Sequence, residues 1–383
     1  MNKLKGMVKS IIGSDTVIYK IISKVYHKLS TAKYKITHIA QESRQRKYYA
    51  EQVKKAVNII NEKYKEAEYI VFYNPTWLGV ANSTKGLFKD IVPLEQVFGD
   101  KNIRLISEAV LDAKIKKVIF SQIVDGWTDV LRYIKDKNQE LQIKVIWHAN
   151  NYEVLSDYTW ELNKNVLKLY DKGYIDEFAF VKKSMAEFYN RAGYKAKYIP
   201  NNVNTEGINK KPTKKTDLNN IRVGLYNANT RELKNAYTQL NAIRLLNNAK
   251  ADIVPTNEAM LKFVDLIGLE NDNLPDYITT KELLERCQDN DINIYITFTE
   301  CSPMLPLESF EVGVPCLVGN NNDYFQNSKL GEYVIVDRED DAEYIANKII
   351  ECLKNKEEVM GLYKEWKKEY DAKCKEYVSN FVK

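Results

Sequence analysis

Two carboxylates eight positions apart, Glu300 and Glu308, have the types and spacing in this chain that point most directly to chemistry. The run 291–298 before them is rich in β-branched and aromatic residues, which predicts a strand. Pro303 and Pro306 stand where the first turn of a helix tolerates proline. We therefore expect Glu300 at the carboxyl end of a strand and Glu308 inside the helix that follows.

The predicted helix start suits a phosphorylated nucleoside. Unpaired backbone N–H groups and the helix dipole together attract phosphate to such an end. Glu308, further into the helix, can accept two hydrogen bonds from a ribose diol, and this charge-assisted pairing would fix a nucleoside. The alternative is a solvated acidic helix start that binds nothing.

The segment TECSPMLPLESFEVGVPCLVG resembles the Glu-x7-Glu motif of retaining glycosyltransferases with the GT-B fold, in particular the family-four group. The resemblance implies that Glu308 binds the donor ribose and that Glu300 lies near the transferred sugar. It also implies that the backbone around Pro303, Met304 and Leu305 holds sugar and phosphate oxygens of the donor.

A second segment, 181–204, resembles the passage of that family into its second domain. Ile199-Pro200-Asn201-Asn202-Val203 matches an Ile-Pro-Asn-Gly-Val pattern, and Asn in place of Gly is a mild departure because Asn tolerates left-handed conformations. Cys301-Ser302-Pro303 replaces the Gly-Phe-Gly that usually follows the first Glu. The resemblance covers most of 68–355, and 1–60 lie outside it.

Strand-like apolar runs alternate with helical ones in two series. The first series lies at 69–73, 116–122, 144–149, 177–181 and 197–200, and the second at 221–226, 251–255, 275–279, 293–298, 315–319 and 333–336. Such alternation predicts parallel sheets covered by helices. We expect an α/β chain of the GT-B type, with two Rossmann-like domains facing a cleft. Open α/β sheets bind ligands outside the carboxyl ends of their strands, which places the functional loops at this cleft.

The length of 383 residues exceeds one ordinary core, so several segments are expected. We predict a basic helical extension at 1–64 and an N-terminal Rossmann-like acceptor domain at 65–203. A C-terminal Rossmann-like nucleotide-sugar domain would follow at 204–355. The remaining helix, 356–383, would pack back on the first domain.

Arg231 and Lys234 follow the first predicted strand of the second domain. The resemblance implies that they neutralise the donor diphosphate, although their spacing is tighter than the usual one. Arg would act as a fork and Lys as a mobile point charge. The alternative is a pair of surface charges at a helix start.

Loops after other strands supply the remaining candidates. His148 ends a predicted strand, and the resemblance implies that it faces the sugar, where an imidazole can hydrogen-bond to a hydroxyl; a structural histidine is the alternative. Asn150, just beyond it, is predicted to bind the acceptor. The resemblance implies that the loop 74–86 lies near the donor phosphates and the acceptor and that Ile278 lies at the nucleobase. Gly79 is therefore expected at the donor and Trp77, an aromatic that suits stacking on a sugar ring, at the acceptor; a core tryptophan is the alternative.

Composition excludes several classes of protein. The five cysteines are odd in number and lack C-x-x-C spacing, so we expect a reduced chain without a metal cage. We predict no metal and no cofactor, with a nucleotide sugar as co-substrate. The loop 74–86 lacks G-x-G-x-x-G, which argues against dinucleotide binding. No apolar run approaches eighteen residues, and a cytoplasmic protein is expected.

The net charge of +5 is divided unevenly. Residues 1–60 hold 13 Lys and Arg against 3 Asp and Glu, whereas the remainder holds 44 against 49. Val17, Ile18, Ile21, Ile22, Val25 and Leu29 recur at helical spacing beside a lysine stripe. This basic amphipathic helix suits an anionic membrane surface, so the protein could be peripheral at the inner face; packing on its own protein is the alternative. Nucleic acid is not expected, since no binding motif accompanies the charge.

The sequence therefore predicts a retaining glycosyltransferase that moves a sugar from a nucleotide-sugar donor to a glycan, lipid-linked or protein acceptor, in cell-surface polysaccharide or glycoconjugate synthesis. The runner-up is a catalytically silent GT-B subunit that partners an active transferase. A GT-B sugar epimerase is a third alternative. Nucleotide-sugar binding with slow hydrolysis would separate the first from the second.

Overall fold

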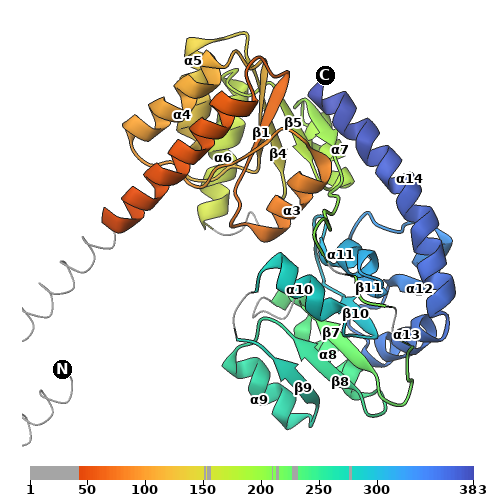
Figure 1. Cartoon of the computed structure of the whole chain (residues 1–383). Coiled ribbons are helices and arrows are strands. Elements are labelled where there is room, and N and C mark those ends of the chain that lie inside the picture. The colour runs from red at the N-terminus through yellow and green to blue at the C-terminus, as the bar shows by residue number, and fades with distance from the viewer. Residues whose placement is uncertain are drawn as a thin grey trace, which may run out of the picture.

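The computed structural model describes residues 43–150, 152, 157–208, 210–212, 215–226, 232–275 and 278–383 (Figure 1). Within these ranges the chain forms two six-stranded parallel sheets with helices between successive strands. The predicted α/β architecture with two Rossmann-like domains is confirmed. The amphipathic segment 17–29 and Arg231 lie outside the described residues.

The first sheet has the strand order β2-β1-β3-β4-β5-β6. Its strands are β1 (Tyr69–Tyr73), β2 (Ile91–Pro93), β3 (Lys117–Ser121), β4 (Gln142–Trp147), β5 (Glu177–Phe180) and β6 (Ala196–Tyr198). Its helices are α3 (Leu78–Leu87), α4 (Asp100–Asp112), α5 (Trp127–Lys137), α6 (Asp157–Asp171) and α7 (Lys183–Arg191). The three-residue strand β2 was not among the strands predicted from the sequence.

Alternating residues of the first sheet face two different cores. Phe72 and Phe120 pack with Trp127 of α5, and the two phenylalanine rings lie 5.5 Å apart. Val71 and Ile119, one residue earlier on each strand, face the opposite side and pack with Phe88 beyond α3. This period of two, with both faces apolar, is what a parallel sheet covered on both sides requires.

The second sheet has the order β12-β11-β10-β7-β8-β9. Its strands are β7 (Arg222–Leu225), β8 (Lys250–Ile253), β9 (Glu270–Asn273), β10 (Ile292–Tyr295), β11 (Cys316–Gly319) and β12 (Ile335–Val336). Its helical elements are η2 (Glu232–Lys234), α8 (Ala236–Arg244), α9 (Glu258–Leu266), α10 (Thr280–Cys287), α11 (Leu305–Glu311), α12 (Lys329–Val334) and α13 (Ala342–Lys354).

One strand of the second sheet differs from the sequence prediction. The apolar run 275–279 was predicted as a strand, whereas the strand is β9, the polar sequence ENDN at 270–273. β9 pairs only with β8 and forms the edge of the sheet, where side chains meet solvent and need not be apolar. Of the predicted strand at 275–279, residues 276–277 lie outside the described residues, and 275, 278 and 279 are not in a strand.

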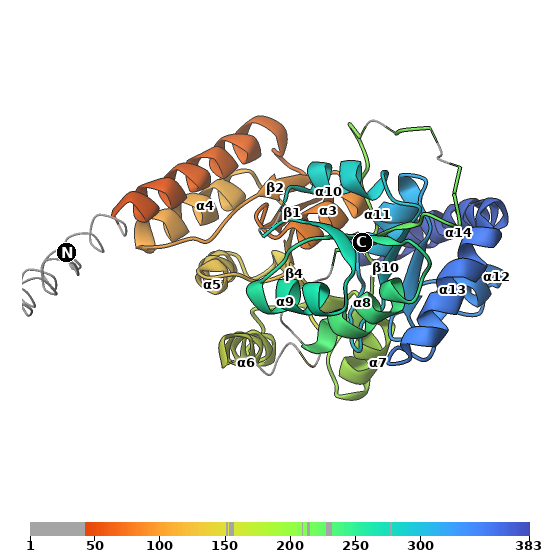
Figure 2. The same ribbon diagram turned by 90° about the horizontal axis from the view of Figure 1, so that it is seen from below.

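A helix covers 43–63, the described part of the basic extension. It lies beside α4 in both views (Figure 1 and Figure 2). Val53, Ala56 and Ile60 are fully buried in the same core as Ile106 of α4. This stretch is therefore a packed layer of the first domain, and its apolar face is occupied by protein.

The last helix, α14 (Lys356–Val382), runs along one side of the molecule from the second domain to the first (Figure 1). Its first half adds Val359, Tyr363 and Tyr370 to the core of the second domain. At its other end, Phe381 is fully buried among residues of the first sheet. The buried Lys144 donates a 2.5 Å hydrogen bond to the Phe381 carbonyl, which fixes that end.

Candidate active site

A cavity of about 320 Å³ lies between the two domains, within the size range of small-molecule pockets. Both domains line it. Six of the sequence-predicted site residues meet there: Gly79, His148, Ile278, Met304, Leu305 and Glu308. Tyr226, Tyr295, Asn201 and Cys301 complete much of the polar wall. The residues come from the carboxyl ends of strands and from the loops and helices that follow them, where open α/β sheets place ligands.

Glu308 lies in the first turn of α11, a seven-residue helix that also has proline in that turn. Its side chain is only 4% exposed. Asn82 of α3 crosses the cleft and donates a 2.5 Å hydrogen bond to Glu308 Oε1, while Asn82 Oδ1 accepts from the Asn204 amide at 3.1 Å. Burial raises the pKa of Glu308 to about 7, and the Asn82 hydrogen bond opposes that rise.

Glu300 and Lys234 form a buried ion pair beside the cavity. The Tyr295 hydroxyl lies between them: it accepts from Lys234 Nζ at 2.9 Å and donates to Glu300 Oε1 at 2.8 Å. Tyr295 lines the cavity, whereas Glu300 and Lys234 stand behind it. Lys182 of the first domain donates to the Glu300 carbonyl at 2.6 Å. Glu300 thus neutralises the Lys234 charge in this arrangement.

His148 follows β4 and is half-buried in the cavity wall. Its Nε2 lies 2.9 Å from Ser121 Oγ. The Cys301 thiol donates to the His148 carbonyl at 2.9 Å, which joins the two domains. Burial lowers the pKa of His148 to about 4, and a hydrogen bond with Asn201 acts in the opposite direction. The imidazole is therefore neutral at physiological pH.

Three other predicted site residues do not line the cavity. Trp77 caps α3 and is 36% exposed, without lining the cavity. Asn150 Nδ2 donates to Thr299 Oγ1 at 3.3 Å, so its amide bridges the domains. Pro303 is buried beside the cavity-lining Met304.

Three polar residues of the cleft were not assigned a role from the sequence. Asn201 donates to the Ser302 carbonyl at 2.6 Å and accepts from Ser83 Oγ at 2.7 Å. It lies in the Ile-Pro-Asn-Asn-Val pattern, so that match contained a usable signal. No such sequence signal marked Asn82, which lies in a helix of mixed composition, or Tyr295, which ends a strand.

Within the described residues, no group of three or more His, Cys, Asp or Glu side chains could hold a metal ion. The same part of the chain contains no helix long and apolar enough to cross a membrane.

No protein-family model matches the chain, and no curated protein matches its sequence. Solved structures do match. Anabaena HepE in complex with UDP aligns with a TM-score of 0.59 at 11% identity, over 82% of this chain and 99% of that one. Trehalose-6-phosphate synthase OtsA aligns with a TM-score of 0.53 at 10% identity, over 82% and 98%. This chain has the GT-B fold.

A third structure is similar over a smaller share. TarM from S. aureus, in a complex that contains UDP, aligns with a TM-score of 0.51 at 14% identity, over 73% of this chain and 59% of that one. At such identities the likeness concerns the fold.

Proposed function

We propose that this GT-B protein is a glycosyltransferase that uses a nucleotide-sugar donor. The observation that carries the proposal is the cavity between the domains, where Glu308 of α11, Gly79 of α3 and Ile278 meet. Among the described residues Glu308 is the only carboxylate that lines this cavity, and a buried carboxylate is a strong acceptor for ribose hydroxyls. HepE with UDP and an E. coli enzyme bound with UDP-2-fluoro glucose share the fold, which supports this class of donor.

The roles follow from the positions of the side chains. Glu308 would accept from the ribose diol, and Ile278 would contact the nucleobase. The Tyr295 hydroxyl, which is hydrogen-bonded to both Lys234 and Glu300, would face the sugar. The departing diphosphate would recruit the Lys234 ammonium, assisted by Arg231, and this electrostatic stabilisation would be the largest catalytic contribution.

Retention of the anomeric configuration and independence of metal are parts of the same proposal. The acceptor hydroxyl would attack from the side of the leaving group, and a phosphate oxygen would take its proton. The neutral His148 could orient a sugar hydroxyl through a hydrogen bond, since its low pKa makes it a weak base.

The acceptor would be a glycan, a lipid-linked intermediate or a protein, held by the first domain. We also propose that the protein acts in the cytoplasm, at an anionic membrane surface. Since 43–63 pack on the first domain, any membrane contact through apolar side chains would depend on residues 1–42.

A panel of nucleoside diphosphates and nucleotide sugars, screened by thermal unfolding, tests the proposal. A ligand at 100 times its Kd should stabilise the protein by roughly 2.7 kcal/mol. The donor that binds should then release nucleoside diphosphate slowly, and NMR of the transferred or hydrolysed sugar should show the original anomeric configuration. Absence of stabilisation by every member of the panel would contradict the proposal.

A further inference from the structure

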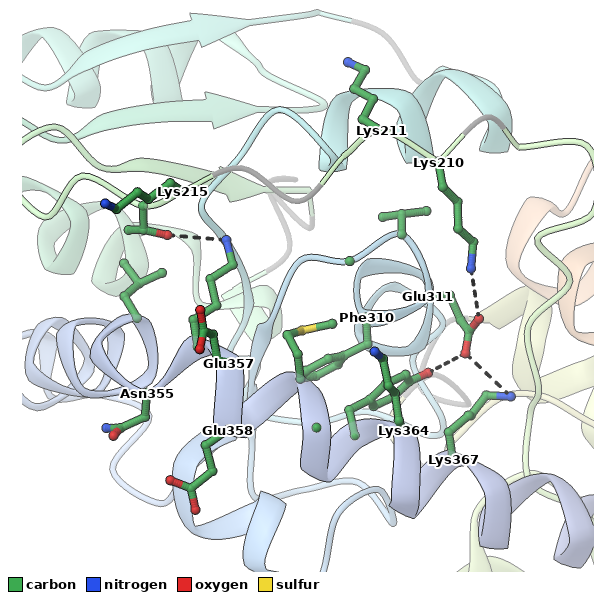
Figure 3. Close-up of a pocket in the computed structure, with 18 of the residues that line it drawn as sticks. Lys210, Lys211, Lys215, Phe310, Glu311, Asn355, Glu357, Glu358, Lys364 and Lys367 are labelled. Carbon is green, nitrogen blue, oxygen red and sulfur yellow. Dashed lines mark hydrogen bonds and ion pairs between the residues drawn. The ribbon is translucent and has the colours of Figure 1, made fainter.

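A second and larger cavity lies away from the cleft. It has a volume of about 1450 Å³ and runs between the linker residues 210–211 and 215–216 and the first part of α14, over the end of α11 (Figure 3). We call this cavity the lysine groove. Glu308 in the cleft and Glu311 in the groove stand one helical turn apart on α11, so the two cavities share that helix.

The lysine groove carries an excess of positive charge. Among the described residues, eight lysines, four carboxylates and no arginine line it. Three of the four carboxylates are already engaged: Glu311 is reached by Lys210 at 3.7 Å and Lys367 at 3.8 Å, as Figure 3 shows, Asp371 holds Lys367 at 2.5 Å, and Glu358 holds Lys329 at 2.6 Å.

Four lysines of the groove are available to an added anion. In the described part of the chain, all four donate no hydrogen bond, form no ion pair and are exposed: Lys215, Lys354, Lys364 and Lys368. Positively charged walls that face each other across a concave surface focus the potential inside it and attract anions.

A glycine supplies a second, independent observation. Gly361 lies inside α14 and lines the groove, where a Cβ atom would meet no other atom within 4 Å. Neither close packing nor a positive φ requires glycine here, although glycine weakens a helix interior relative to alanine. An open surface at Gly361 lets a ligand approach the backbone of α14.

The chemistry of the groove favours a flexible anionic chain. Lysines act as mobile point charges and tolerate variable spacing of carboxylates, phosphates or sulfates, whereas arginine forks suit fixed bidentate contacts. The aromatic rings beneath the groove, Phe310 and Tyr363, stack on each other at 4.4 Å and are buried, so they are not free to stack on nucleobases. The concave shape suits a chain better than a flat membrane.

We propose that the lysine groove binds an anionic glycan, a sugar chain that bears carboxylate, phosphate or sulfate groups. One turn of α11 separates the groove from the cleft, so such a chain would be held close to the transfer site. The inference that this anionic glycan is the acceptor rests on the proposed function. The inference that the groove binds an anionic glycan does not.

A heparin-derived hexasaccharide is a suitable probe, with maltohexaose as the neutral counterpart of equal length. Calorimetry with the full chain should show binding of the charged probe alone, weakened by added salt. Reversing two charges in Lys364→Glu/Lys368→Glu should weaken binding by about tenfold or more. The matched control is Lys373→Glu/Lys375→Glu, the same change on exposed residues of α14 outside the groove, which should retain affinity within about twofold.

A second variant separates binding from folding. Gly361→Leu replaces glycine with a better helix former, so the Tm should stay equal or rise. The leucine side chain should block the groove and lower the affinity for the hexasaccharide. Equal losses in both lysine pairs, or binding of maltohexaose at the same strength, would overturn the proposal. So would binding of anionic vesicles but not of the hexasaccharide. Nucleotide-sugar binding is measured separately, so that failure of the donor screen with intact hexasaccharide binding would overturn the proposed function and leave the groove assignment standing.

Discussion

Burial pushes both titratable groups of the cleft toward their neutral forms. The pKa of the Glu308 carboxyl rises to about 7, and the pKa of the His148 imidazole falls to about 4. The pKa of Glu308 is thus above its ordinary value, whereas the pKa of His148 is below its ordinary value. At neutral pH, Glu308 is poised between its two forms, whereas His148 is uncharged. Ligand binding and stability should accordingly depend on pH through different residues.

Donor affinity should follow the ionisation of Glu308. Below pH 7 the carboxyl carries a proton and loses acceptor capacity, so the affinity for a nucleotide sugar should fall by about tenfold between pH 8 and pH 6. The diphosphate diester of the ligand does not titrate in this range. Calorimetry across these pH values makes the measurement. Glu308→Gln should bind weakly at every pH, and an equally steep profile in that variant would contradict the assignment.

Stability should depend on His148 in the acid range. Because its pKa in the folded state is below the unfolded value of 6.5, its favourable contribution is complete above pH 6.5 and is lost as pH falls toward 4. Urea unfolding should show that wild-type protein loses at most about 2 kcal/mol more than His148→Asn between pH 7.5 and pH 5. Parallel losses in the two proteins would show that the imidazole is not buried in solution.

Two helices from different domains define the cleft at the scale of elements. α3 contributes Asn82 and α11 contributes Glu308, and the hydrogen bond between them crosses the cavity wall. The sequence predicted α11 and its carboxylate because proline, spacing and the preceding strand all indicated the same element. It could not predict Asn82, since the partner of a buried carboxylate lies 226 positions away and depends on how the domains meet.

Asn82→Ala should move the pH profile of donor binding to higher pH. The Asn82 hydrogen bond lowers the pKa of Glu308, so its loss should raise that pKa further above the ordinary value. Calorimetry at pH 7 should show weaker donor binding than in wild type, with recovery near pH 9. Ser83→Ala, which removes a neighbouring hydroxyl of α3 without touching Glu308, is the matched control. An unchanged profile in Asn82→Ala would mean that the amide does not contact the carboxylate in solution.

At the scale of the whole molecule, α14 ties the two domains together. Its buried Phe381 lies in a core of the first domain although the helix begins in the second. Phe381→Ala should reduce the free energy of unfolding by about 3 kcal/mol, because a large buried ring leaves a cavity. Chemical denaturation measures the loss, with Glu376→Ala, an exposed residue of the same helix, as the control. A loss no greater than that of the control would indicate that the end of α14 is not docked.

Much of this architecture could be predicted from the sequence alone. Runs such as 69–73 and 315–319 were readable as strands because buried parallel strands are continuously apolar. The polar edge strand β9 lacks that signal, so it could not be recognised. Of the site, the residues adjacent to strand ends were found. The Tyr295 bridge between Lys234 and Glu300 was not, because it depends on side-chain geometry rather than spacing.

Hydrogen–deuterium exchange of the full chain, with and without the nucleotide sugar that stabilises it most, tests the central claim directly. A donor bound between the domains should protect peptides from both of them: 78–87 of the first domain, and 278–287 and 301–311 of the second. Peptides over 354–371 in the lysine groove should exchange as in the free protein. Protection confined to one domain, protection of the groove alone, or no protection under saturating donor would contradict the account.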